Sequence, residues 1–170
     1  MKLALALTPR TSVSALLAAA LAGCAAAPDG NDAAPPSAQR PQIQEPLVDL
    51  RGTSWQLVNF QSSDDDIGTL VPPNREGYTL TLDADGTANL QLDCNRASSR
   101  WSADPVVGRS GSITFAPGAM TRAYCGDAAM DSRIAADLPN LRSWVIADGD
   151  LYLALVADGG IYRWTPAPAQ

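Results

Sequence analysis

The stretch YTLTLDADGTANLQL, residues 78–92, indicates how the folded part of this 170-residue chain is built. Two short runs rich in threonine and leucine flank Asp85-Gly86, and apolar and polar residues alternate along the first run. An Asp-Gly pair supplies the positive φ angle that a tight hairpin turn requires. The stretch therefore predicts two antiparallel strands joined by a short turn.

The same pattern recurs elsewhere in the chain. Short runs that are rich in β-branched or aromatic residues and bounded by turn signals predict further strands. With the opening stretch, the expected strands are TSWQLVNF (53–60), YTLTLD (78–83), GTANLQL (86–92), SWVIAD (143–148), DLYLALV (150–156) and GIYRW (160–164). Asp148-Gly149 and Asp158-Gly159 separate the last three runs, which predicts a second meander over residues 143–164.

One amphipathic helix is expected among these strands. Asp127 can cap a helix that runs to Leu138, directly before Pro139. Met130, Ile134 and Leu138 recur at every fourth position and so lie on one face. The domain is therefore expected to be mostly β (α+β), with this helix packed across the apolar face of the sheet or into an open barrel.

Residues 1–23 have the features of a secretory signal peptide. Lys2 and Arg10 form a positive region, and the uncharged run TSVSALLAAALA (11–22) follows it. This run is too short for a permanent membrane helix, which needs about 20 apolar residues.

The residues Leu21, Ala22, Gly23 and Cys24 resemble the lipobox of bacterial lipoproteins. Cleavage before Cys24 would leave its thiol carrying a diacylglyceryl group, and acyl chains at about 0.8 kcal/mol per buried CH₂ can anchor a protein. An ordinary signal peptide followed by a chance cysteine is the alternative. Ala25 resembles the second mature residue of outer-membrane lipoproteins. We therefore expect an exported, lipid-anchored envelope protein that faces the periplasm if the source is Gram-negative.

The segment after Cys24 has the composition of a tether. Residues 25–46 hold five prolines and almost no large apolar side chains, so residues 24–46 are expected to be a lipidated cysteine followed by a disordered linker. Residues 47–166 remain as one folded domain, and residues 167–170 as a C-terminal tail.

Composition argues against several functions. Without residues 1–23 the chain has ten basic residues, all arginine, against 18 acidic ones, a net charge of −8 that does not favour nucleic acid. The chain has no histidine, and its lysine is lost with the signal peptide, which removes the usual triads and histidine–zinc sites. The acidic run 64–66 is expected to be a solvated loop. Asp83 and Asp85 are expected to belong to a turn, since the spacing of an EF-hand loop is absent around them. We expect no enzyme activity, cofactor or metal.

Four segments then appear in a fixed order, namely LRGTSWQL (50–57), LQLDCNRASSRW (90–101), ITFAPGAMTRAYC (113–125) and DLYLAL (150–155). In this order and spacing they resemble the META domain, also called HslJ-like. The resemblance implies a small antiparallel, open-barrel-like sheet with a helix lodged against or across it. It also implies an envelope lipoprotein associated with stress or antibiotic tolerance.

Within this resemblance, Asn95, Trp101, Thr121 and Arg122 are the candidate motif or binding residues. For Thr121 and Arg122 a structural role is the alternative, in which the threonine orders a turn and the arginine pairs with a carboxylate. The family commonly has glycine where this chain has Asp93.

The two cysteines that remain beside Cys24 are Cys94 and Cys125. An even pair in an oxidising compartment most often forms a disulfide. A zinc site would lack ligands and a catalytic thiol would lack a base, while a reduced buried pair stays open as the alternative.

Three functions are compatible with these observations. The first, which we favour, is a non-enzymatic module that binds an envelope protein. The second is a carrier of a small apolar or lipid ligand, with a cavity lined by Trp55, Leu80, Leu90, Ile134 and Leu153. The third is an inhibitor of an envelope hydrolase that acts through a loop at residues 95–111.

Lipidation of Cys24 is directly testable. The intact mass of membrane-extracted protein is expected to correspond to a mature chain that begins at a diacylated or triacylated Cys24. Cys24→Ser should release the protein from the membrane fraction. A mature chain that begins elsewhere, or membrane association unchanged by the substitution, would contradict lipidation.

Overall fold

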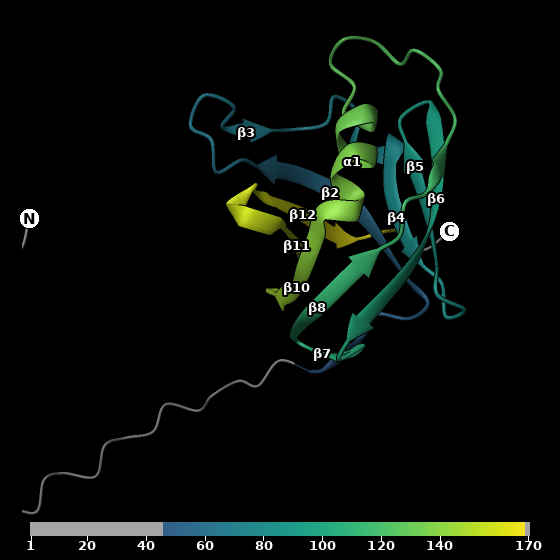
Figure 1. Cartoon of the computed structure of the whole chain (residues 1–170), viewed down its shortest axis with the longest axis vertical. Helices are drawn as coiled ribbons and strands as arrows, with labels where there is room; N and C mark the ends of the chain where they lie inside the picture. Colours follow the sequence, from purple (N-terminus) through teal and green to yellow (C-terminus); the bar gives the residue numbers. More distant parts are fainter. Residues whose placement is uncertain (1–45, 169–170) are drawn as a thin grey trace, which may run out of the picture. The chain divides into compact units, whose positions relative to one another are not determined.

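The computed structural model describes residues 46–168 (Figure 1). The expected signal peptide, the lipidation site and nearly all of the tether lie outside these residues. In the part that is described, no helix is long and apolar enough to cross a membrane.

Residues 46–168 form short and long β-strands, one α-helix and three 3₁₀ turns. The strands are β1 Val48–Asp49, β2 Thr53–Gln61, β3 Thr69–Leu70, β4 Tyr78–Leu82, β5 Thr87–Leu92, β6 Asn95–Asp104, β7 Val107–Gly108, β8 Ser110–Phe115, β9 Ala119–Met120, β10 Leu141–Ala147, β11 Asp150–Leu155 and β12 Ile161–Pro166. The helix is α1 Asp131–Asp137, and the 3₁₀ turns are Arg75–Gly77, Leu138–Asn140 and Val156–Asp158. All six strands expected from the sequence are present.

The long strands form a closed antiparallel barrel in the order β12-β11-β10-β8-β6-β5-β4-β2. The sheet closes because β12 also pairs with β2, with Tyr162 opposite Phe60 and Trp164 opposite Leu57. The expected mostly-β fold with one helix is confirmed. It differs in one detail, since the sheet that was expected to be open-barrel-like has its two end strands bonded to each other.

The expectation of a loop at residues 95–111 is wrong, because β6 occupies most of that range and pairs with β5 and β8. Its inward side chains are those of Asn95, Ala97, Ser99, Trp101 and Ala103. Four of these five are small or polar, so the run lacks the apolar alternation that marks a half-buried strand. The hypothesis of an inhibitor that acts through a protruding loop at residues 95–111 is therefore not supported.

Two turns show why the backbone takes these connections. At the β10–β11 hairpin, Asp148 and Gly149 both have positive φ, 53° and 80°, as a two-residue hairpin turn requires. Asp93, in the β5–β6 hairpin, has a φ of 58°. This conformation explains why glycine suits the position in the family, and aspartate is among the residues that tolerate it.

The helix begins later than expected. α1 starts at Asp131, with Met130 as its N-cap residue, and Asp127 does not cap it. The carboxylate of Asp127 instead accepts a hydrogen bond from the Tyr124 hydroxyl, while the Met130 N–H donates to Tyr78 Oη at 3.0 Å. A contact with strand β4 therefore sets the start of the helix.

The apolar face of the helix packs on the barrel as expected, with Met130, Ile134 and Leu138 all buried. At its other end, Tyr162 Oη on β12 donates to Asp137 Oδ2 at 2.5 Å. Burial raises the pKa of Tyr162, so the hydroxyl stays protonated as a donor. In Figure 1, α1 lies between β10–β12 on one side of the view and β5 and β6 on the other.

The barrel interior is filled by side chains. The five residues expected to line a ligand cavity are all buried in one continuous core, with exposed fractions of 4% or less, namely Trp55, Leu80, Leu90, Ile134 and Leu153. The largest fully buried side chains, Trp144 and Trp164, lie in the same core. This packing does not favour a ligand at the place where the carrier hypothesis put it.

Cys94 and Cys125 form a disulfide, with their Cα atoms 5.6 Å apart. Cys94 lies in the β5–β6 turn, and Cys125 lies in the segment that leads into α1. The bond therefore ties a barrel hairpin to the approach of the helix.

Loss of this crosslink should destabilise the domain. For a closed loop spanning 31 positions in sequence, the loop-entropy model gives about 3–4 kcal/mol. Cys94→Ser and Cys125→Ser should each lower the melting temperature in circular dichroism, and the double variant should melt no lower than the worse single one. Cys24→Ser is the matched control and should leave the melting temperature unchanged. Two free thiols in the unreduced, denatured wild-type chain would contradict the pairing.

Candidate functional site

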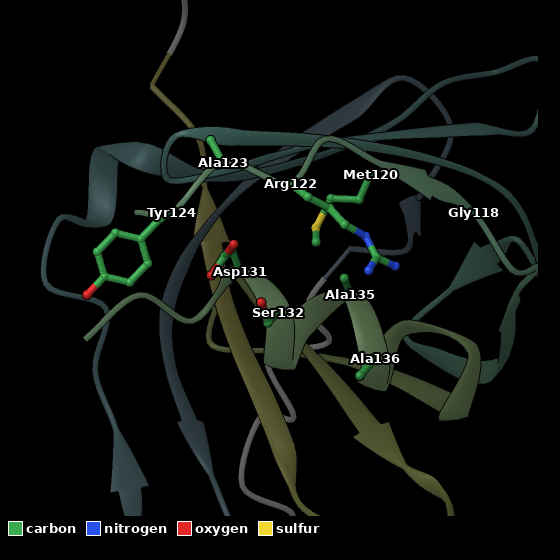
Figure 2. A pocket seen from close by; sticks show the side chains of 9 residues that line it. All are labelled: Gly118, Met120, Arg122, Ala123, Tyr124, Asp131, Ser132, Ala135 and Ala136. Atoms are coloured by element: carbon green, nitrogen blue, oxygen red, sulfur yellow. The ribbon is translucent and has the colours of Figure 1, made fainter. Parts of the chain in front are cut away.

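A groove of about 520 Å³ lies between helix α1 and the segment 118–124 (Figure 2). Its lining residues are Gly118, Met120, Arg122, Ala123, Tyr124, Asp131, Ser132, Ala135 and Ala136. A smaller pocket of about 30 Å³ adjoins it and shares Gly118, Met120 and Ala135. Pockets that bind ligands typically measure about 300–1,000 Å³, so the groove has the size of a binding site.

The segment on one side of the groove is held by the side chain of Asn95, which is fully buried. Asn95 Oδ1 accepts hydrogen bonds from Thr121 Oγ1 at 2.9 Å and from the Ala123 N–H at 2.8 Å. Asn95 Nδ2 donates to the Ala123 carbonyl at 2.9 Å. The amide thus binds the backbone of residue 123 as a neighbouring strand would.

The same amide also reaches the helix. Asn95 Nδ2 donates to Asp131 Oδ2 at 2.7 Å, so both donors and both lone pairs of the amide are used. This orientation of the amide is the favourable one, because the reverse would place its carbonyl oxygen against a carboxylate. Asn95 therefore fixes the distance between the two sides of the groove.

Thr121 orders the segment next to this amide. Its hydroxyl donates to Asn95 and accepts from the Arg96 N–H at 3.0 Å, while the Thr121 N–H donates to the Arg96 carbonyl. These contacts agree with the structural role considered for Thr121, in which the threonine orders the local backbone.

Arg122 is exposed and, within residues 46–168, has no hydrogen bond or salt bridge. The structural role considered for Arg122, an ion pair with a nearby carboxylate, is therefore not seen among the described residues. Figure 2 shows its guanidinium directed toward Ala135 and away from Asp131.

Asp131 places a negative charge in the wall of the groove. It is only 7% exposed, and among the described residues its carboxylate has no salt bridge. As the first residue of α1 it lies where the helix dipole favours negative charge. The partner that the structure gives its carboxylate is the neutral Asn95 amide.

Tyr124 stands at the end of the groove with 80% of its surface exposed. Its hydroxyl donates to Asp127 Oδ1 at 2.5 Å, and this hydrogen bond raises the pKa of Tyr124. Tyrosine and arginine are both among the residues enriched at binding hot spots.

The structure thus brings Asn95, Thr121 and Arg122 together, and it places Trp101 elsewhere. Trp101 is 7% exposed, and its Nε1 donates to the Asp83 carbonyl in the β4–β5 turn. Sequence reasoning missed Asp131, for which the available signal was a carboxylate beside the apolar stripe of the helix. Within the described part of the chain, no group of three or more potential metal ligands is present.

These features define a small closed β-barrel domain with one helix packed on it and a groove beside that helix. A family model described as the META domain matches residues 48–166. The chain therefore belongs to the META domain family, and the resemblance seen in its motifs is confirmed.

Two solved structures are similar to this chain, and no curated protein matches it. An NMR structure of a protein from Burkholderia xenovorans is 18% identical, with a TM-score of 0.57, and the match covers 86% of this chain and 100% of that chain. A crystal structure of a DUF4847 family protein from Bacteroides vulgatus is 15% identical, with a TM-score of 0.48, covering 71% of this chain and 96% of that one. The first likeness shows the fold.

The role of Asn95 can be measured through stability. Asn95→Ala leaves the buried Asp131 carboxylate and the Ala123 backbone without their partner, which should lower the free energy of unfolding by about 3 kcal/mol. Asn89→Ala is the matched control, because Asn89 is exposed and its side-chain amide, among the described residues, donates only to the Asp83 carboxylate. The control should cost less than about 1 kcal/mol, and equal losses in urea unfolding for the two variants would contradict the role given to Asn95.

Proposed function

We propose that this chain is a lipid-anchored envelope protein whose META domain binds another protein through the groove beside α1. The observation that carries the proposal is the groove itself, with an exposed Tyr124, an unpaired Arg122 and a buried Asp131 along one cavity. These groups can form hydrogen bonds, ion pairs and aromatic contacts with a partner. A role in stress or antibiotic tolerance, as the family resemblance implies, belongs to the same proposal.

The packing of the barrel supports a surface site over an interior one. The residues that would line an interior cavity are core residues, whereas the groove is lined by exposed and small side chains such as Ser132 and Ala136. Protein partners generally bind through accessible surface that contains aromatic and arginine anchors. Membrane attachment through Cys24 would place this surface in the envelope.

Site-specific crosslinking in cells tests the proposal. A photoreactive benzoylphenylalanine is introduced in the full chain at Ala136, an exposed groove residue, and separately at Ser102, an exposed residue of β6 that lines neither pocket. We expect a discrete protein adduct, identified by mass spectrometry of membrane extracts, at position 136 and none at position 102. Arg122→Ala should reduce that adduct, because it removes an unpaired cation from the groove.

The other outcomes count against protein binding. Adducts with lipid alone at position 136 would favour the carrier function. The same protein adducts at both positions would show that the groove is not the binding surface.

A further inference from the structure

We propose that the groove binds an extended peptide segment of the partner, added as a strand to the free edge of β9, with a basic side chain paired to Asp131. The inference rests on the proposed function and names the chemistry of the partner. It is carried by the topology around β9 and by the charge of Asp131.

The free edge follows from how β6 is paired. Along β6, β5 covers one edge, while the other edge is covered first by β9 and then by β8. β8 has β10 on its far side, but β9 pairs with no strand other than β6 in the described residues. The sheet therefore splits beside β9, and the groove and α1 lie at this split.

The backbone on this edge is available for hydrogen bonding. The Thr121 N–H points to β6, where it donates to the Arg96 carbonyl. Because hydrogen-bonding direction alternates along an antiparallel strand, the N–H and C=O groups of Met120 and Arg122 point away from β6. Within residues 46–168, the Arg122 and Tyr124 N–H groups have no hydrogen bond. An added strand supplies partners for such groups, which is how many peptide-binding domains gain affinity.

The charge of Asp131 indicates which side chain the peptide carries. Asp131 and Asp150 are equally buried, each 7% exposed. Asp150 pairs with Arg163 within the chain, with Nε and Oδ2 2.6 Å apart. Where Asp150 has an arginine, Asp131 has the neutral amide of Asn95 as its partner. Buried charges are normally paired with an opposite charge. Since Asp131 lines the groove, a lysine or arginine from outside can provide the missing cation.

The walls of the groove fit an extended chain. On the helix side they are formed by small side chains, Ser132, Ala135 and Ala136, which let a backbone approach closely. The volume of about 520 Å³ accommodates several residues of an extended segment. The net negative charge of the chain favours approach of a basic segment as well.

Binding of defined peptides to the full chain tests the inference. The probes are fluorescent heptapeptides of threonine, serine, valine and leucine in mixed order, with lysine, arginine, norleucine or glutamate at the centre. We expect fluorescence polarisation to show binding about tenfold tighter for lysine or arginine than for norleucine. Asp131→Asn, which keeps an oxygen to accept from Asn95, should remove this preference. Asp158→Asn makes the same charge change in the β11–β12 turn and should leave the preference intact.

N-methylated peptides test strand addition without altering the protein. Only every second backbone N–H of an added strand faces β9. Methylation of these amides should abolish binding, whereas methylation of the amides in between should leave the affinity unchanged. Equal effects of both sets would overturn strand addition. No binding, no preference for a basic centre, or a preference unchanged by Asp131→Asn would overturn the inference as a whole.

The two proposals fail separately. A protein adduct at position 136 that basic peptides do not displace would overturn the peptide inference and leave the proposed function standing. Specific peptide binding without any protein adduct in cells would instead overturn the proposed envelope partner.

Discussion

The buried amide of Asn95 is the interaction on which the arrangement of segment, helix and groove depends. Residues 121–125 form no strand or helix, yet Asn95 satisfies both backbone groups of Ala123. In this segment the side chain therefore takes the place of a neighbouring strand that the topology does not supply. Because the same amide binds Asp131, one residue sets the positions of the segment and of the first turn of α1. Cys94, its neighbour in sequence, adds the covalent bond to Cys125.

Closure of the barrel determines which strand edges of the described residues stay free. The pairing of β12 with β2 removes the edges that an open sheet would expose. Edges remain on short strands that branch from the barrel, such as β3 and β9. β3 pairs with the end of β2, at Phe60 and Gln61, and lines neither pocket, whereas β9 lines both. The groove therefore lies where β10 stops, because β10 pairs only with residues 110–112 of β8 and no described strand lies beside β9.

The sequence was sufficient for the parts of the fold whose residues carry a local pattern. The strands β4, β5 and β10 follow from alternation and from Asp-Gly turns, and the motifs around Cys94 and Thr121 pointed to the family. β6 was missed because its inward residues Asn95, Ala97 and Ser99 are polar or small and so give no apolar alternation. The start of α1 was misplaced because the Met130 N–H bonds Tyr78, 52 positions away, and no local signal reports such a contact. Asp131 was missed for the same reason, since its importance comes from Asn95 on a distant strand.

The disulfide and the buried carboxylate of Asp131 lie in the same part of the domain. A buried carboxylate without a cation destabilises a fold, because its desolvation is only partly offset by hydrogen bonds to neutral groups. The loop-entropy contribution of a crosslink of this length is about 3–4 kcal/mol. Cys125 lies six positions before Asp131, in the segment that the Asn95 amide also holds. The crosslink therefore stabilises the part of the domain that contains Asp131, whose carboxylate has no salt bridge among the described residues, whereas Asp150 pairs with Arg163.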